Sequence, residues 1–330
     1  MEKILPVNRP PITAYMTHAP ILSILANNDK YLPWFFLNYL QIRIHEDGAD
    51  FYNFYTAHFS CPFLDTSYLP KQFISRHINT EITNFFTSCI DDNLYIISLI
   101  NVSFIELYSQ DYDNMHPIFI YGYNKDKEIF YVADFFIHGR FSFRETSFKE
   151  VSLAYENCDD TQHWQHGVHL LKPIEYNKKY SLIYFVDTLK RYLYGYEPSV
   201  GYNQNIDTKV EFGLNAFYDR LNKEIEQFKG NQRHDERIFA IFCEHKIVLR
   251  LLSEFLIKNG CEKFNELQRE YNDLYEKSMT FRNNYLRYRL KRINSSYDGS
   301  RLFTLKDTEV HLLKRTINVL ESYINDDMYF

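Results

Sequence analysis

The chain has 330 residues, more than a usual single domain, so we expect two packed units or one domain with a large extension. Aromatic residues make up 18% of it, while Gly and Pro number only 10 each, which excludes long flexible linkers and indicates packed surfaces. The net charge of -6 argues against nucleic acid as a partner, because general binding to nucleic acid requires a basic surface.

The N-terminal sequence MEKILPVNRPPITAY has charges and prolines where a signal peptide has an unbroken apolar stretch. No later segment approaches the apolar length that spans a membrane, so we expect a cytoplasmic protein with no membrane partner. The cysteines include no CxxC pair, and neither a zinc knuckle nor a disulfide framework is predicted. They are Cys61, Cys89, Cys158, Cys243 and Cys261.

The first predicted elements are helical. ILSILAN, from Ile21 to Asn27, carries apolar residues at helical spacing and predicts a buried helix. YLPWFFLNYLQIRI is apolar or aromatic from Tyr31 to Leu40, which predicts a second core segment that begins as a helix and can continue as a strand. LYIISLINVSFIEL is rich in β-branched and aromatic residues around Asn101, a pattern typical of two short strands joined by a turn.

The next segments predict more of the sheet. The apolar runs PIFIYGYN and EIFYVADFF are separated by the polar residues NKDK, which predicts a β-hairpin. RFSFRETSF alternates apolar and polar residues and predicts a further strand. Together these segments predict an antiparallel sheet between about residues 94 and 150.

Beyond Lys209 the apolar period becomes helical. VEFGLNAFYDRLNKEIEQFKG repeats apolar residues at three- and four-residue steps and ends on Gly230. RIFAIFCEHKIVLRLLSEFLIKNG ends on Gly260, and residues 262–290 and 305–323 complete a pattern of four helices. The predicted fold class is α+β, with an antiparallel sheet in an N-terminal unit, residues 1–205, and a C-terminal helical unit, residues 206–330.

The predicted hairpin begins at His116 and carries Asp134 near the end of its second strand. An Asp in an otherwise apolar strand is costly unless something pairs with it. Asp134 can accept the ring N–H of His116, fix its tautomer and stabilise its protonated form, as in Cys/His/Asp and Ser/His/Asp systems. The other interpretation is a strand-end Asp in solvent beside an ordinary surface His.

The segments THAPILSILANNDKYLPWFFLNYLQI and HPIFIYGYNKDKEIFYVADF resemble the papain-like family of the butirosin acyltransferase N-terminal domain, a relative of the double-glycine leader peptidases. The resemblance covers most of about the first 200 residues. Members of this family move acyl groups from the phosphopantetheine thioester of an acyl carrier protein to an amine. The resemblance implies a papain-like N-terminal unit in which His116 is the catalytic histidine and Asp134 its orienting group.

The chain departs from this family at the nucleophile. Papain-like members have a Cys at the N-terminus of the first helix, where the helix dipole and the His lower its pKa. In the same register this chain has Met16, Thr17, His18 and Ala19, and a thioether cannot attack a carbonyl in this way.

Three accounts follow from the missing thiol. In the first, His116 activates an amine that attacks the thioester directly, while amides near Thr17 and His18 hold the oxyanion and Met16 lines the substrate site. In the second, another residue is the nucleophile. The candidates are Thr17, Ser23 and a cysteine from elsewhere in the chain, of which Cys61 is the favoured substitute thiol in the substrate site. In the third, the protein has lost its chemistry and persists as a binding or scaffold protein.

RNNYLRYRLKR, from Arg282 to Arg292, has five basic residues and no acid. A charge run of this kind usually is the solvated face of a helix, here with Leu286 and Leu290 packing inward. On the family resemblance, the partner is an acidic acyl or peptidyl carrier protein, which Arg287 and Arg289 would attract and whose phosphate they would bind. Its phosphopantetheine is then part of the substrate, and no other cofactor is expected.

HWQHGVH contains His163, His166 and His169, a spacing that can place metal ligands on one helical face. Its flanks instead indicate a loop passing into a strand, and no Cys or carboxylate at fixed spacing completes a site. We interpret the segment as a solvated loop and predict no metal, with the lining of a substrate channel as the alternative.

The leading hypothesis is an acyltransferase or amide-forming enzyme of specialised metabolism that transfers an acyl or peptidyl group from a carrier-protein thioester to a small amine acceptor. A non-catalytic papain-like binding protein is the alternative from another class. A hydrolase, in which water replaces the amine, is a further one. Protease activity is the least favoured, since unactivated peptide bonds demand the missing nucleophile most.

Overall fold

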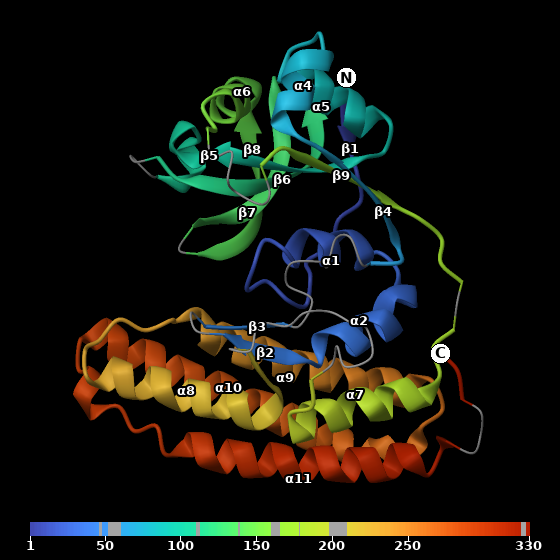
Figure 1. Cartoon of the computed structure of the whole chain (residues 1–330), viewed down its shortest axis with the longest axis vertical. Helices are drawn as coiled ribbons and strands as arrows, with labels where there is room; N and C mark the ends of the chain where they lie inside the picture. The colour runs from blue at the N-terminus through green and yellow to red at the C-terminus, as the bar shows by residue number, and fades with distance from the viewer. Residues whose placement is uncertain are drawn as a thin grey trace. The chain divides into compact units, whose positions relative to one another are not determined.

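The computed structural model describes residues 1–45, 48–51, 61–109, 113–137, 139–159, 166–177, 179–197, 210–324 and 328–330. It contains both helices and antiparallel strands, which confirms the predicted α+β class. The chain divides into two compact units, whose elements are labelled in Figure 1. The first comprises Met1–Asp29 and Tyr55–Tyr176, and the second comprises Lys30–Phe54 and Asn177–Phe330.

The first unit is built on an antiparallel sheet with the strand order β4-β9-β5-β6-β7-β8. The short strand β1 also belongs to this sheet and pairs with β6. Its strands are β1 Glu2–Ile4, β4 Leu64–Leu69, β5 Tyr95–Asn101, β6 Met115–Asn124, β7 Ile129–Ile137, β8 Arg140–Ser147 and β9 Val168–Pro173. The predicted hairpin is confirmed as β6 and β7, and the predicted strand after it is confirmed as β8.

Helices α5 (Ile82–Asp91) and α6 (Phe148–Glu156) cover one face of this sheet (Figure 1). The ring of Phe86, on α5, packs edge-on against Phe130 of β7, and Phe148 of α6 packs on the same Phe130. Because side chains of a strand alternate between faces, every second residue of β7 from Phe130 points toward these helices.

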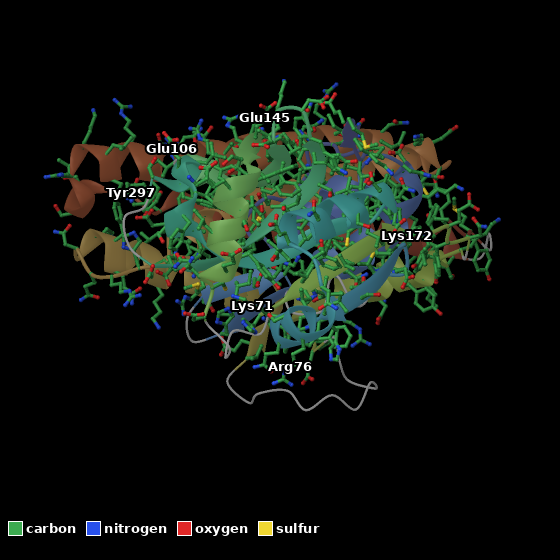
Figure 2. The ribbon with its side chains drawn as sticks, turned by 90° about the horizontal axis from the view of Figure 1, so that it is seen from above. Lys71, Arg76, Glu106, Glu145, Lys172 and Tyr297 are labelled. Carbon is green, nitrogen blue, oxygen red and sulfur yellow. The ribbon has the colours of Figure 1, made fainter. Side chains whose placement is uncertain are left out.

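The C-terminus of α6 is held by α4 (Lys71–His77). Lys71, labelled in Figure 2, donates from Nζ to the carbonyl oxygens of Tyr155, Glu156 and Cys158 at 2.6, 3.1 and 2.7 Å. A cation at these carbonyls complements the negative end of the helix dipole. This contact ties the end of α6 to α4.

The predicted pair of short strands around Asn101 is wrong in its second half. β5 ends at Asn101, and two turns of 3-10 helix follow, η2 (Val102–Phe104) and η3 (Glu106–Tyr108). The Asn101 side chain accepts hydrogen bonds from the N–H and the hydroxyl of Ser103 at 3.2 and 2.8 Å, so a turn begins where a second strand was predicted. The turn brings Tyr108 to β7.

The second unit is helical and also contains a small sheet of order β10-β2-β3. Its strands are β2 Ile42–His45, β3 Gly48–Phe51 and β10 Glu211–Phe212, and its helices are α2 Leu32–Tyr39, α7 Leu182–Tyr194, α8 Gly213–Lys229, α9 Arg237–Lys258, α10 Asn265–Lys291 and α11 Arg301–Glu321. The four helices predicted after residue 209 are confirmed as α8 to α11, which run alongside one another in Figure 1. Within the described segments, no helix has the length and hydropathy needed to cross a bilayer.

The two units divide the chain differently from the predicted domains 1–205 and 206–330. Both α7 and the segment Lys30–Phe54 belong to the helical unit. Gln41 donates from Nε2 to the Thr188 carbonyl of α7 at 2.7 Å, and β2 pairs with β10. These contacts join segments far apart in the sequence, so local patterns did not indicate them.

The helical unit buries a charged pair between α9 and α11. Lys246 Nζ lies 2.6 Å from Glu309 Oε2, and both side chains are fully buried. Tyr218 of α8 and Tyr192 of α7 donate to the two oxygens of the Glu309 carboxylate at 2.6 and 3.1 Å. The carboxylate therefore links four helices of the unit.

Candidate active site

His116 and Asp134 lie at one end of the β6–β7 hairpin. Phe119 pairs with Ala133, so the continued register places Ile118 opposite Asp134 and His116 two residues farther along the same face. His116 Nδ1 lies 2.9 Å from Asp134 Oδ2. The contact that the sequence predicted between these two side chains is confirmed.

The Asp134 carboxylate is fully buried and accepts three hydrogen bonds. His116 and the Tyr108 hydroxyl both donate to Oδ2, and the Phe135 N–H donates to Oδ1 at 2.7 Å. His116 Nδ1 also lies 3.0 Å from the Pro117 carbonyl, so this nitrogen carries the proton. The opposite nitrogen, Nε2, has no hydrogen bond to any described residue, and the side chain is 35% exposed.

The surroundings of His116 favour its protonated form. Burial by itself disfavours the imidazolium, but the Asp134 charge, its hydrogen bond and the Pro117 carbonyl outweigh burial and raise the pKa of His116 above its usual 6.5. Burial, strengthened by the Asp134 charge, raises the pKa of Tyr108 well above its usual value, so Tyr108 stays a neutral donor. The arrangement can take up a proton at Nε2 and return it, which is general base and acid chemistry.

Tyr108 is a site residue that the sequence did not indicate. A buried carboxylate has room for more donors than one histidine, so a further donor was to be expected on general grounds. Nothing in the spacing of SFIELYSQ selects this tyrosine, because it reaches Asp134 through the turns after Asn101.

Met16, Thr17 and His18 form the turn before α1 (Ala19–Leu25), and all three are buried. The predicted helix over residues 21–27 is confirmed as α1. His116 makes no hydrogen bond or ring contact with Met16, Thr17 or His18 in the described part of the chain.

Strand alternation accounts for this separation. His116 pairs with Ile100 of β5, and paired residues point to the same face of a sheet. Ile100 lies an odd number of residues from Tyr95 along the strand, so Tyr95 points to the other face. The Tyr95 hydroxyl donates to the Pro6 carbonyl at 2.6 Å, and the Asn8 N–H donates to the Ser23 carbonyl of α1 at 3.0 Å. Helix α1 is thus connected through residues 6–8 to the face opposite His116.

The amides predicted to hold an oxyanion are used within their own turn. The N–H groups of His18 and Ala19 both donate to the Tyr15 carbonyl, at 3.1 and 3.0 Å. The predicted role of the His18 amide is therefore not supported. The Thr17 hydroxyl is buried without a hydrogen-bond partner among the described residues, so Thr17 retains unused hydrogen-bonding capacity.

Cys61 lies three residues before the start of β4 and is 3% exposed. Burial raises the pKa of its thiol to about 12, so at neutral pH it is not the thiolate that attacks a carbonyl. The other four cysteines are buried as well. The predicted use of Cys61 as a substitute nucleophile is not supported by this environment.

Arg287 and Arg289 are exposed near the end of α10, in the second unit, whereas His116 belongs to the first. Arg289 Nη1 lies 2.5 Å from Glu236 Oε2, so its charge is paired. The expectation that Leu290 packs inward is wrong, since it is 83% exposed. Tyr285 is the buried residue of this run, and Leu290 lies roughly 140° around the helix from it.

His166 lies just before β9 and His169 within it, and both are buried. The prediction of a solvated loop is therefore wrong for these two residues, because β9 pairs with both β4 and β5. Burial lowers the pKa of His169 to about 4, so it is neutral at pH 7. His163 lies outside the described residues. Within the described ranges, these histidines included, no cluster of His, Cys, Asp and Glu could hold a metal ion.

The fold and the site define an α+β protein whose sheet carries a buried aspartate beside a partly exposed histidine. A scan against protein-family models finds no match for the chain, and a search of curated proteins finds no relative. Family and activity are accordingly inferred from the site and from the sequence pattern.

Proposed function

We propose that the protein is an acyltransferase or amide-forming enzyme that transfers an acyl or peptidyl group from a carrier-protein thioester to an amine. The contact between His116 Nδ1 and the buried Asp134 carboxylate carries the proposal. A buried carboxylate behind a partly exposed imidazole is an arrangement suited to a general base. The resemblance of the N-terminal sequence to the papain-like butirosin acyltransferase family supplies the substrate class.

In the proposed reaction the amine attacks the thioester directly. His116 Nε2 removes a proton from the amine as the C–N bond forms and the carbonyl becomes a tetrahedral oxyanion. When this intermediate collapses, the C–S bond breaks and the leaving sulfur takes the proton back from Nε2. Asp134 holds Nδ1 protonated and stabilises the imidazolium during the step. An activated thioester and a good amine nucleophile require no thiol of the enzyme.

The proposed donor is an acyl or peptidyl carrier protein, in the cytoplasm and within specialised metabolism. Carrier proteins of this kind are acidic, and Arg287 is an exposed cation that is proposed to attract them. Arg289 contributes less on this view, because Glu236 already pairs with it.

Incubation of the pure protein with an acylated carrier protein and a diamine tests the proposal. We expect amide product with the wild-type chain and a loss of about a hundredfold or more with His116→Ala. His77→Ala is a matched control, because His77 is an exposed histidine of the same unit. Equal turnover by wild type and His116→Ala would remove His116 from the proposed role.

A non-catalytic binding protein is the second candidate function. It is favoured by Met16, which stands at the position of the family's nucleophile and is buried in a turn that, among the described residues, makes no hydrogen bond or ring contact with His116. Intact-mass measurement after exposure to an acyl thioester separates the accounts. Product without an adduct supports direct aminolysis, an adduct on Thr17 or Cys61 supports covalent catalysis, and binding with neither supports the second function.

A further inference from the structure

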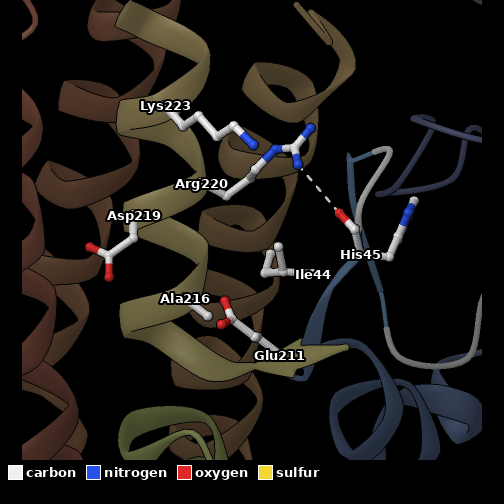
Figure 3. A pocket seen from close by; sticks show the side chains of 7 residues that line it. All are labelled: Ile44, His45, Glu211, Ala216, Asp219, Arg220 and Lys223. Atoms are coloured by element: carbon white, nitrogen blue, oxygen red, sulfur yellow. Dashed lines mark hydrogen bonds between the residues drawn. The ribbon is translucent and has the colours of Figure 1, made fainter. Parts of the chain in front are cut away.

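A hollow of about 300 Å³ lies in the helical unit, where α8 passes the small sheet (Figure 3). Glu211 pairs with Ile44, which brings β10 and β2 together as one wall. Ala216, Asp219, Arg220 and Lys223 of α8 form the other wall. These four positions follow the three- and four-residue steps of one helix face, so they form a continuous wall.

The charges around the hollow are separated by sign along α8. Figure 3 shows the Glu211 carboxylate beside Ala216 at one end and the Lys223 amino group beside Arg220 at the other. Ile44, 6% exposed, supplies an apolar surface between them. Ala216 and Arg220 lie one helical turn apart, so the acidic and basic ends are separated by roughly 6 Å along the helix axis.

The charged groups around the hollow differ in how far they are already paired. Arg220 is fixed by Glu224, with Nη2 at 2.6 Å from Oε1, and donates to the His45 carbonyl at 3.3 Å. Glu211 and Lys223 are exposed, and neither has an ion-pair partner among the described residues. These two groups are therefore available to a ligand of opposite polarity at each end.

We propose that this hollow binds a small zwitterion whose ammonium and carboxylate are separated, with the ammonium at Glu211 and the carboxylate at Lys223. An ω-amino acid and a dipeptide share this chemistry. An α-amino acid does not, because its two charges are adjacent and cannot reach both ends. Asp219, which lies next to Arg220 on the same wall, is paired with Lys306 at 3.5 Å. The site is independent of the proposed acyl transfer and uses none of its residues.

Isothermal titration calorimetry on the full chain tests the proposal with five probes. They are 5-aminopentanoate, glycylglycine, norvaline, pentanoate and pentylamine. Norvaline is an isomer of 5-aminopentanoate with adjacent charges, and the last two probes each lack one charge. We expect 5-aminopentanoate or glycylglycine to bind, with the other three at least about tenfold weaker. Preference for one of the first two identifies the ligand as an amino acid or a peptide.

Substitutions at the two ends complete the test. Lys223→Met and Glu211→Gln should each weaken binding about tenfold. Lys314→Met, at an exposed lysine of α11, should leave it unchanged. Norvaline bound as tightly as 5-aminopentanoate, binding unaffected by Lys223→Met, or no binding of either separated zwitterion would each overturn the proposal. None of these results bears on His116, so acyl transfer is judged separately.

Discussion

Asp134 governs the titration of the candidate site, because one of its oxygens serves two donors. His116 Nδ1 and the Tyr108 hydroxyl both donate to Oδ2, while the Phe135 N–H donates to Oδ1. A buried carboxylate is tolerated only when its lone pairs are satisfied. The two donors share one acceptor, so changing either the charge or the competing donor must alter the pKa of His116.

Replacement of Asp134 by Asn should lower the pKa of His116. The carboxylate charge that raises this pKa is lost, while burial, which lowers it, remains. His116 acts as a base only when the pH of the solution is above its pKa. The acyl-transfer rate should therefore rise with pH around a midpoint set by this pKa, and the midpoint should move to lower pH in the variant. The rate itself should fall about a hundredfold or more. Titration of the His116 ring by NMR measures the shift, and an unchanged pKa would contradict the assigned role of Asp134.

Replacement of Tyr108 by Phe should change the same pKa in the opposite direction. Without the competing hydroxyl, the Asp134 carboxylate is less satisfied and holds the His116 proton more strongly. The free energy of unfolding should fall by about 1 to 2 kcal/mol, because a buried hydrogen bond is lost. Tyr95→Phe is the matched control, since its hydroxyl bonds to Pro6 on the other face and should leave the His116 titration unchanged.

At the scale of secondary-structure elements, α9 and α11 depend on a buried ion pair rather than on apolar contact alone. Lys246 lies against Glu309, and its amino group also faces the ring of Phe242 at 4.8 Å. Burying two charges is costly unless each is paired, so the pair stabilises the packing only as long as both partners are present. It also specifies which helix faces meet.

Lys246→Met should lower the free energy of unfolding by about 3 kcal/mol or more, because Glu309 is then left buried without its cation. A double variant that also carries Glu309→Leu should recover part of this loss. Lys277→Met removes an exposed pair with Asp273 and should cost less than about 1 kcal/mol. Urea unfolding followed by circular dichroism measures all three. A double variant less stable than Lys246→Met would argue against this account.

At the scale of the whole molecule, each unit contains a buried neutral histidine. His169 in the first unit has a pKa lowered by burial to about 4. In the second unit, burial and then the Lys246 charge lower the pKa of His245 well below its usual value. His116 differs, because its pKa is raised. The stability that His116 contributes is fully present below pH 6.5 and is lost as the pH rises through its folded pKa.

Acid should therefore destabilise the protein between pH 6.5 and about 4. In this window the unfolded chain binds a proton at residue 169 that the folded chain does not, so the free energy of unfolding falls as the pH is lowered. His169 alone accounts for up to about 3 kcal/mol over the window. His169→Gln should make the dependence of stability on pH less steep there, with the contribution of His245 remaining, and His77→Gln, at an exposed position, should not change it. An equal slope in wild type and His169→Gln would contradict the assignment.

The sequence by itself determined the elements whose pattern is local. The β6–β7 hairpin, the helices α8 to α11, and the nearness of His116 and Asp134 all follow from period and turn chemistry within a short stretch of chain. Long-range contacts decided the rest. Tyr108 reaches Asp134 through the two turns that follow Asn101, the first of which is held by the Asn101 side chain. The segment Lys30–Phe54 joins the helical unit through the hydrogen bond of Gln41 and the pairing of β2. Strand alternation put His116 on the face opposite the one connected to α1. Periodicity states which side of an element is apolar, but partners distant in sequence are fixed only when the elements pack.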